Sequence, residues 1–72
     1  MEPYYDYLTQ IDARVTYLDE IIGTETNMMM AAYLRNIANL YRKAAAELRH
    51  NRIADGLAHF EFAQRQFREV YA

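Results

Sequence analysis

Apolar residues recur along this chain at alternating intervals of four and three positions, in three separate runs. Such spacing keeps the residues on one side of an α-helix, so each run predicts one amphipathic helix. The runs are Tyr4, Leu8, Ile11, Val15, Leu18 and Ile22; Met30, Leu34, Ile37, Tyr41, Ala44 and Leu48; and Ile53, Leu57, Phe60, Phe67 and Tyr71. We therefore predict an all-α protein with residues 1–72 as one domain, either a three-helix bundle or an antiparallel helical hairpin with an extra N-terminal helix.

Local signals indicate where the first helix begins and ends. Pro3 suits a first helical turn, because its missing N–H would have no partner there. The helix is expected to run to about Ile22, with Gly23 as a left-handed C-terminal cap. A side-chain oxygen is expected to cap the second helix. The candidates for that cap are Thr24, Thr26 and Asn27.

The second helix is expected over Met28 to roughly His50, and the third from Ile53 to about Tyr71. Asn51 tolerates the turn between them, and a turn this short makes the two helices antiparallel neighbours. Gly56 lies inside the third helix, where it costs roughly 1 kcal/mol relative to alanine. A glycine in that position often marks a close approach of two backbones.

The chain has 72 residues, and a single core of this size rarely leaves more than roughly 3–5 kcal/mol of net stability without staples or oligomerisation. There is no cysteine, which fits a reducing compartment. The opening MEPYYDYLTQ lacks the basic start and long apolar run of a signal peptide, and no window approaches transmembrane length. We expect a cytoplasmic protein that does not bind a membrane.

Charge is distributed unevenly. Residues 1–27 hold six acids against Arg14, whereas residues 28–72 hold seven bases against four acids. Arg14 is expected to extend its charged head into solvent. A row at seven-residue spacing on the second helix consists of Arg35, Arg42 and Arg49. We expect this row to pair with the acidic first helix. Three arginines carry little positive charge for binding phosphates, so nucleic acid is not the expected partner.

Several apolar residues lie off the stripes and mark a surface expected to bind a partner. The stripes themselves are richer than so short a chain is expected to hide alone, which favours packing against another protein. The second helix is expected to lie between the other two, with the remaining apolar surface open. The candidate partner-binding residues are Met29, Tyr33, Leu40, Ala54, Ala58 and Phe62.

Other off-stripe residues suit either a core or an interface. Met28, Met29 and Met30 are adaptable side chains that fill gaps or form a tolerant binding surface, and we expect them to fill the core. Tyr5 and Tyr17 suit an interface, because tyrosine offers a large contact area for little loss of conformational entropy.

The sequence predicts no catalytic residue, no cofactor and no metal site. Glu47 and His50 have the i, i+3 spacing of carboxylate-bridged metal sites, but such a site needs further ligands and here lies beside Arg49. Arg52 and His59 are spaced like the Arg–His signature of small helical RNases, a motif short enough to arise by chance. We therefore do not expect an enzyme.

Two stretches resemble known helical families. NRIADGLAHFEFAQ, residues 51–64, is similar to the second helix of a tetratricopeptide repeat. Across residues 33–71, the pairs Leu34-Arg35 and Glu47-Leu48, the short polar turn and the aromatic, glutamine-bearing last helix resemble the small helical-hairpin co-chaperones of type III secretion needle subunits. That resemblance implies a cytoplasmic protein that pairs with a tetratricopeptide-type chaperone and keeps a needle subunit from polymerising early.

Taken together, these features predict a non-enzymatic protein-binding module, a chaperone or adaptor that buries apolar helix faces against a partner protein. The alternative is a self-associating helical bundle with a structural or nucleic-acid-binding regulatory role. A protein partner, in a hetero- or homo-oligomer, is expected in either case.

Overall fold

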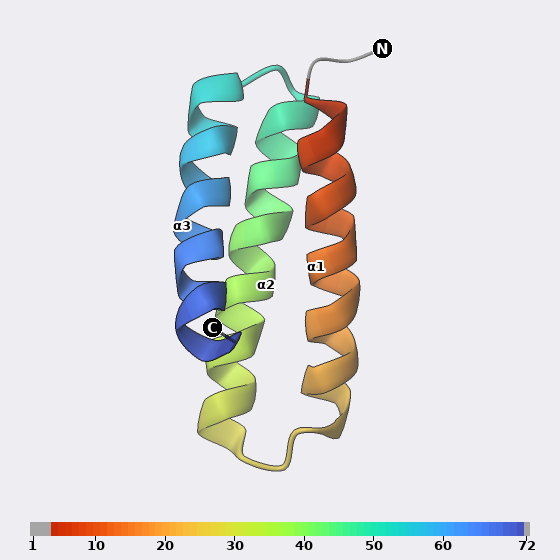
Figure 1. The fold of residues 1–72 in the computed structure, drawn as a ribbon, viewed down its shortest axis with the longest axis vertical. Coiled ribbons are helices and arrows are strands. Elements are labelled where there is room, and N and C mark those ends of the chain that lie inside the picture. Colours follow the sequence, from red (N-terminus) through yellow and green to blue (C-terminus); the bar gives the residue numbers. More distant parts are fainter. Residues whose placement is uncertain (1–3, 72) are drawn as a thin grey trace.

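The computed structural model describes residues 4–71 and shows three helices joined by two short turns (Figure 1). Helix α1 spans Tyr5–Thr24, α2 spans Met28–Arg49 and α3 spans Ile53–Tyr71. Helices α1 and α3 run in the same direction, and α2 runs in the opposite one (Figure 1). The prediction of an all-α three-helix bundle is confirmed, while Pro3 lies outside the described residues.

Helix α2 is the central helix. It packs against both neighbours, whereas the backbones of α1 and α3 scarcely approach each other. Both flanking helices therefore bury their stripes on α2. The side chains of α2 that are completely or almost completely buried are Leu34, Ile37, Ala38, Tyr41, Ala44, Ala45 and Leu48. The expectation of a covered central helix is confirmed, although Met30 at the start of the stripe is exposed.

The way in which α1 ends differs from the prediction. Gly23 lies within α1, has no left-handed backbone, and is followed by one more helical residue. The end of the helix is satisfied without a left-handed residue, because Thr24 Oγ1 donates to the Ile21 carbonyl at 3.2 Å and the Glu25 N–H donates to the Ile22 carbonyl at 3.3 Å. The prediction of Gly23 as a C-terminal cap is therefore wrong.

The predictions for Asn27, Asn51 and Gly56 are confirmed. Asn27 caps α2, since its Oδ1 accepts from the Met30 N–H at 3.0 Å. Asn51 adopts φ 61°, the left-handed conformation that the turn into α3 requires. Gly56 is the site of close approach to α2, because a Cβ there would lie 2.8 Å from the Leu48 side chain.

The methionines at the start of α2 do not fill the core. Met28 and Met29 are 85% and 84% exposed, and Met30 is also exposed. In Figure 1 the first turn of α2 extends beyond the last described turn of α3, so α3 does not cover it. The expectation that these methionines fill the core is wrong. Whether they are covered depends on how far α3 extends along α2, and the spacing of apolar residues does not determine that.

Candidate protein-binding surfaces

Of the predicted partner-binding residues, the structure brings Leu40 of α2 and Phe62 of α3 together, and the surface around them, with Met29 and Tyr33, is here called the α2–α3 face. Met29 is 84% exposed and Phe62 is 46% exposed, whereas Tyr33 and Leu40 are half-buried at the edge of the core. Ala54 and Ala58 are also exposed on α3, but neither lines the hollow that Phe62 shares with Leu40, and Ala54 lies seven residues before Glu61, on another flank of the helix. The α2–α3 face thus combines one large exposed aromatic side chain with smaller apolar neighbours, but it is not a continuous apolar surface.

A shallow hollow of about 320 Å³ lies at the middle of the α2–α3 face. Leu40 and Phe62 line it from opposite helices, and the other lining side chains are Asn36, Asn39, Lys43 and Gln66. Apolar side chains surrounded by amides and one cation resemble the centre and rim of a protein interface. Toward the far end of α3, the Tyr33 hydroxyl lies 3.5 Å from a carboxylate oxygen of Glu69.

At the end near the second turn, α2 and α3 are joined by a polar contact that the sequence did not indicate. Nδ1 of His59 lies 2.6 Å from Oε1 of Glu47 and 3.0 Å from the carbonyl oxygen of Asp55. Both partners are acceptors, so Nδ1 carries the proton and donates to them. Glu47 is therefore engaged with His59 and not with His50. No group of three potential metal ligands occurs within residues 4–71.

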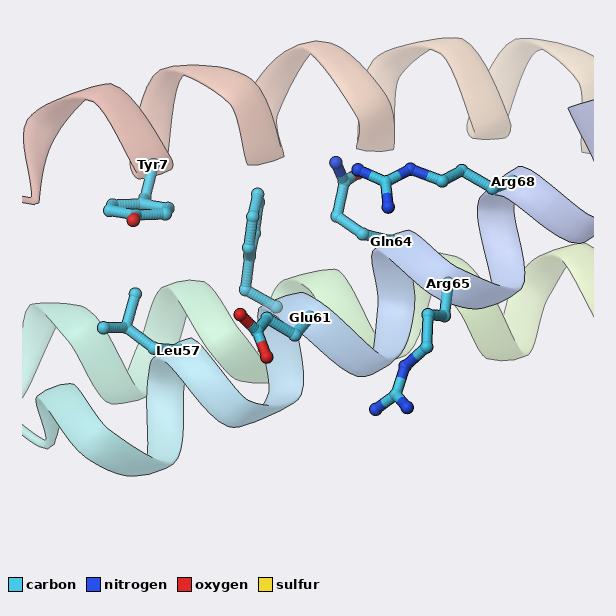
Figure 2. A pocket seen from close by; sticks show the side chains of 7 residues that line it. Tyr7, Leu57, Glu61, Gln64, Arg65 and Arg68 are labelled. Atoms are coloured by element: carbon cyan, nitrogen blue, oxygen red, sulfur yellow. The ribbon is translucent and has the colours of Figure 1, made fainter. Parts of the chain in front are cut away.

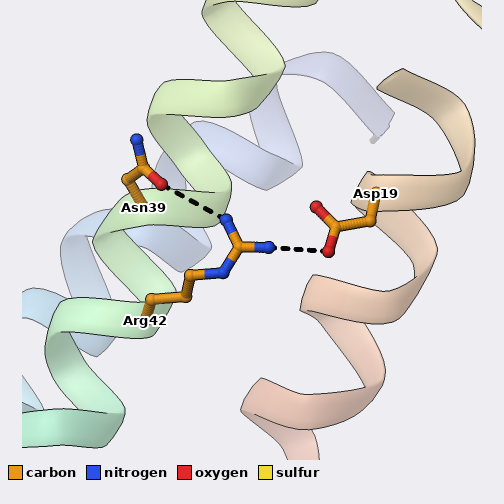
Figure 3. Close-up of polar contacts among 3 residues, drawn as sticks. All are labelled: Asp19, Asn39 and Arg42. Carbon is orange, nitrogen blue, oxygen red and sulfur yellow. Dashed lines mark hydrogen bonds and ion pairs between the residues drawn. The ribbon is translucent and has the colours of Figure 1, made fainter. Parts of the chain in front are cut away.

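The flank between α1 and α2 carries the predicted pairing of opposite charges. Arg42 donates to Asp19 Oδ2 at 2.6 Å and to Asn39 Oδ1 at 3.3 Å (Figure 3). The prediction that the arginine row pairs with the acidic first helix is confirmed at this position. Arg35 and Arg49 form no ion pair with any residue in the described part of the chain.

A further hollow lies between α1 and α3 and is called the α1–α3 groove. It measures about 480 Å³, and Figure 2 shows Tyr7, Leu57, Gln64 and Arg68 between the two helices. The lining residues are Tyr7, Leu57, Phe60, Glu61, Gln64, Arg65 and Arg68. None of these was among the predicted site residues. The groove forms because α1 and α3 both pack on α2, and the residue pattern of α1 or of α3 alone does not reveal it.

Aromatic side chains bridge α1 and α3 where their backbones stand apart. The ring of Tyr7 meets Phe60 edge to face with centroids 5.1 Å apart. Tyr17 reaches both Phe67 and Tyr71, at 6.1 Å and 5.5 Å. Tyr17 is 43% exposed and also contacts α3, whereas Tyr5 is 57% exposed. Tyr7 and Tyr17 thus help to hold the bundle together.

Two arginines approach the buried hydroxyl of Tyr41 beneath this groove. The Arg14 guanidinium lies 4.3 Å above the Phe67 ring, a cation–π contact, and so turns toward α3 instead of extending into solvent as expected. The Tyr41 hydroxyl donates to Oε1 of Gln64. Burial raises the pKa of Tyr41, and the positive charges of Arg14 and Arg68 oppose that shift.

Comparisons with known proteins assign no relatives to this chain. No protein-family model, no curated protein and no solved structure matches it. None of the helices within residues 4–71 is long and apolar enough to cross a membrane. A functional conclusion therefore depends on the surfaces described above.

Proposed function

We propose that this protein is a non-enzymatic protein-binding module, a chaperone or adaptor that buries the α2–α3 face against a partner protein. The observation that supports this proposal most directly is Phe62, whose ring is 46% exposed at the edge of a hollow that it shares with Leu40. Large aromatic side chains in such positions supply much of the binding free energy of protein interfaces. Met29 extends the apolar surface and adapts to different partner shapes.

The mode of binding proposed is that of helix faces packing together. Tyr33, Leu40 and Phe62 provide the central contacts, with the amides of Asn36 and Gln66 at the rim. Because the core stripe of α2 is already buried within the chain, the partner would meet a preformed surface. Preformed surfaces lose little conformational entropy on binding.

The test uses a photo-crosslinking amino acid at Phe62 in the cells that make the protein, with Arg35 as the matched control position on the far flank of α2. The crosslinked protein is identified, purified and titrated against the intact chain by calorimetry. We expect Phe62→Ala and Leu40→Ala each to weaken binding by at least about tenfold, which is about 1.4 kcal/mol. Far-UV circular dichroism must show that both variants remain folded.

Unchanged binding in both folded variants would refute the assignment of the α2–α3 face. Light scattering across concentrations separates the alternative function, because a stable homodimer that involves Phe62 would make this a self-associating structural or regulatory protein. A monomer at all concentrations supports a different protein as the partner. Steeply salt-dependent binding of DNA or RNA would support the regulatory alternative.

The resemblance to co-chaperones of type III secretion needle subunits narrows this proposal to one kind of partner. Such a chain would act in the cytoplasm and pair with a tetratricopeptide-type chaperone. The residues that carry the resemblance, 33–71, form an antiparallel pair of helices here. Helix α1 has no counterpart in that comparison, so a complex of this type would have to accommodate a third helix. Identification of the protein crosslinked to Phe62 tests this partner directly.

A further inference from the structure

We infer that the α1–α3 groove is a second docking site, which accepts an acidic amphipathic helix from a partner protein. This surface lies on the opposite side of α3 from Phe62, and none of its lining residues belongs to the α2–α3 face. The inference is therefore independent of the function proposed above. It depends on three properties of the groove, namely its shape, its apolar floor and its charge.

The shape is that of a helical bundle with one position open. Helices α1 and α3 both pack on α2 but scarcely approach each other through their backbones, and α2 is visible between them in Figure 1. A fourth helix that lay over this opening would run alongside two parallel helices, as in common four-helix packing. The hollow of about 480 Å³ is the part of the opening that the chain's own side chains leave unfilled.

The floor of the groove is apolar and rigid. Phe60 is buried and is held by the edge-to-face contact with Tyr7, and Leu57 lies half-buried beside them. A leucine or phenylalanine on the incoming helix would cover these groups and remove the exposed part of Tyr7 from water. The floor thus offers an anchor point for an apolar side chain.

The rim is positive. Arg65 and Arg68 line the groove and are exposed, and Arg14 lies nearby over the Phe67 ring, whereas Glu61 is the one carboxylate among the lining residues within 4–71. None of the three arginines forms an ion pair with a described residue. Figure 2 shows Gln64 extending toward α1 and Arg68 running along the groove toward Gln64, whereas Arg65 points away from α1 at the outer edge of α3. Carboxylates on the incoming helix would satisfy this charge.

Charge disfavours a second copy of the chain that docks symmetrically, with groove against groove. Two grooves that met with α3 against α3 would bring the Arg65 and Arg68 side chains of both copies together, which is unfavourable. Single-stranded nucleic acid is disfavoured for another reason. Base stacking needs an open aromatic face, but Phe60 is buried and is already in contact with Tyr7.

The experiment titrates the isotope-labelled full chain with a designed peptide of about 18 residues, long enough for five helical turns. The peptide has leucine at positions i, i+3, i+4 and i+7 and glutamate on both flanks of that stripe. The matched probe has lysine in place of every glutamate. The variant Arg65→Glu/Arg68→Glu is compared with Arg35→Glu/Arg52→Glu, which makes the same charge change away from the groove.

We expect the acidic peptide alone to bind, with amide shifts centred on Tyr7, Gln64 and Arg68. Affinity should fall at least about tenfold in Arg65→Glu/Arg68→Glu and stay the same in the control variant. Thermal unfolding checks that the variants remain folded. If the reversal of charge near the end of α3 prevents folding, Arg65→Gln/Arg68→Gln replaces the first variant.

Equal binding of both peptides, or shifts centred on Leu40 and Phe62, would overturn the inference. So would the absence of binding by the acidic peptide. The inference would also be overturned if an oligothymidine bound through Arg65 and Arg68 and the acidic peptide did not bind. Failure of the Phe62 experiments would leave these outcomes unaffected, because the two surfaces share no residue.

Discussion

Leu48 of α2 packs directly on Gly56 of α3. A Cβ atom at position 56 would lie 2.8 Å from both Cγ and Cδ2 of Leu48 and 3.2 Å from the carbonyl oxygen of Ala44. Leu48 is completely buried, so its side chain has no free space into which to withdraw. The absence of a side chain at Gly56 therefore sets the distance between α2 and α3 near the turn that joins them.

This relationship predicts opposite effects for the two glycines of the chain. Gly56→Ala is expected to destabilise the protein by about 1–3 kcal/mol through overpacking, although alanine is favoured in a helix by roughly 1 kcal/mol. Gly23→Ala is expected to stabilise it by about 0.4–1 kcal/mol, since Gly23 is helical and a Cβ there would meet no atom within 4 Å. Urea unfolding followed by circular dichroism measures both changes. A shift of both variants in the same direction would contradict the close packing at Gly56.

The two glycines also show what the sequence could and could not predict. The close approach at Gly56 was predicted, because a glycine within a long amphipathic run usually has a packing reason. The role of Gly23 was predicted wrongly, because a helix can also end through the hydroxyl of Thr24 and the extended backbone of Glu25. Helix number, the central position of α2 and the core stripes follow from periodicity alone.

The surfaces were less predictable than the core. Exposure of Phe62 follows from its position off the stripe, and exposure of Met29 depends on where α3 ends relative to α2. The α1–α3 groove depends on contacts between α1 and α3, such as that of Tyr7 with Phe60. These contacts arise from the lateral spacing of two helices on a third, which no residue pattern within one helix determines.

The cap of α2 gives a second prediction. Three polar residues were candidates for it, and the structure assigns the role to Asn27 through the bond to the Met30 N–H. Asn27→Ala is expected to lower the free energy of unfolding by about 1 kcal/mol. Thr26→Ala is the matched control, because Thr26 is exposed and its side chain makes no hydrogen bond to a residue within 4–71. Equal losses in the two variants would refute the assignment.

The two polar bridges of the bundle are expected to differ in strength. Glu47 and His59 are 13% and 32% exposed, whereas Asp19 and Arg42 are 49% and 48% exposed. A double-mutant cycle to alanine should give a coupling of about 0.5–1.5 kcal/mol for the Glu47–His59 pair. The exposed Asp19–Arg42 pair should give about 0.2–1 kcal/mol and lose most of it in molar salt.

Denaturant titrations of the single and double variants at low and high salt provide these couplings. Screening by salt should reduce the Asp19–Arg42 coupling more than that of Glu47–His59, because water and ions reach the exposed pair. If the Glu47–His59 coupling were absent, the short contact between α2 and α3 would not stabilise the fold.

Burial of Tyr41 predicts a loss of stability at alkaline pH. Burial raises the pKa of Tyr41 above its ordinary value of about 10 in the folded chain, despite the opposing charge of Arg14. As pH rises past that value, the unfolded chain releases the proton first, so folding becomes less favourable until the folded-state pKa is passed. Below about pH 10, Tyr41 contributes no such dependence. Tyr71, whose pKa is also raised by burial, adds to the same decline.

Tyr41→Phe separates this effect from the hydrogen bond to Gln64. The variant is expected to be less stable than the parent by about 1 kcal/mol at neutral pH, because the amide oxygen of Gln64 loses its donor. Above about pH 10 its stability should fall less steeply, so the two curves approach each other. Urea unfolding between about pH 7 and pH 11.5 measures both curves. Tyr71→Phe is the control for the raised pKa of Tyr71. If the free energy of unfolding of Tyr41→Phe and of the parent changed with pH in parallel, the Tyr41 proton would not be linked to folding.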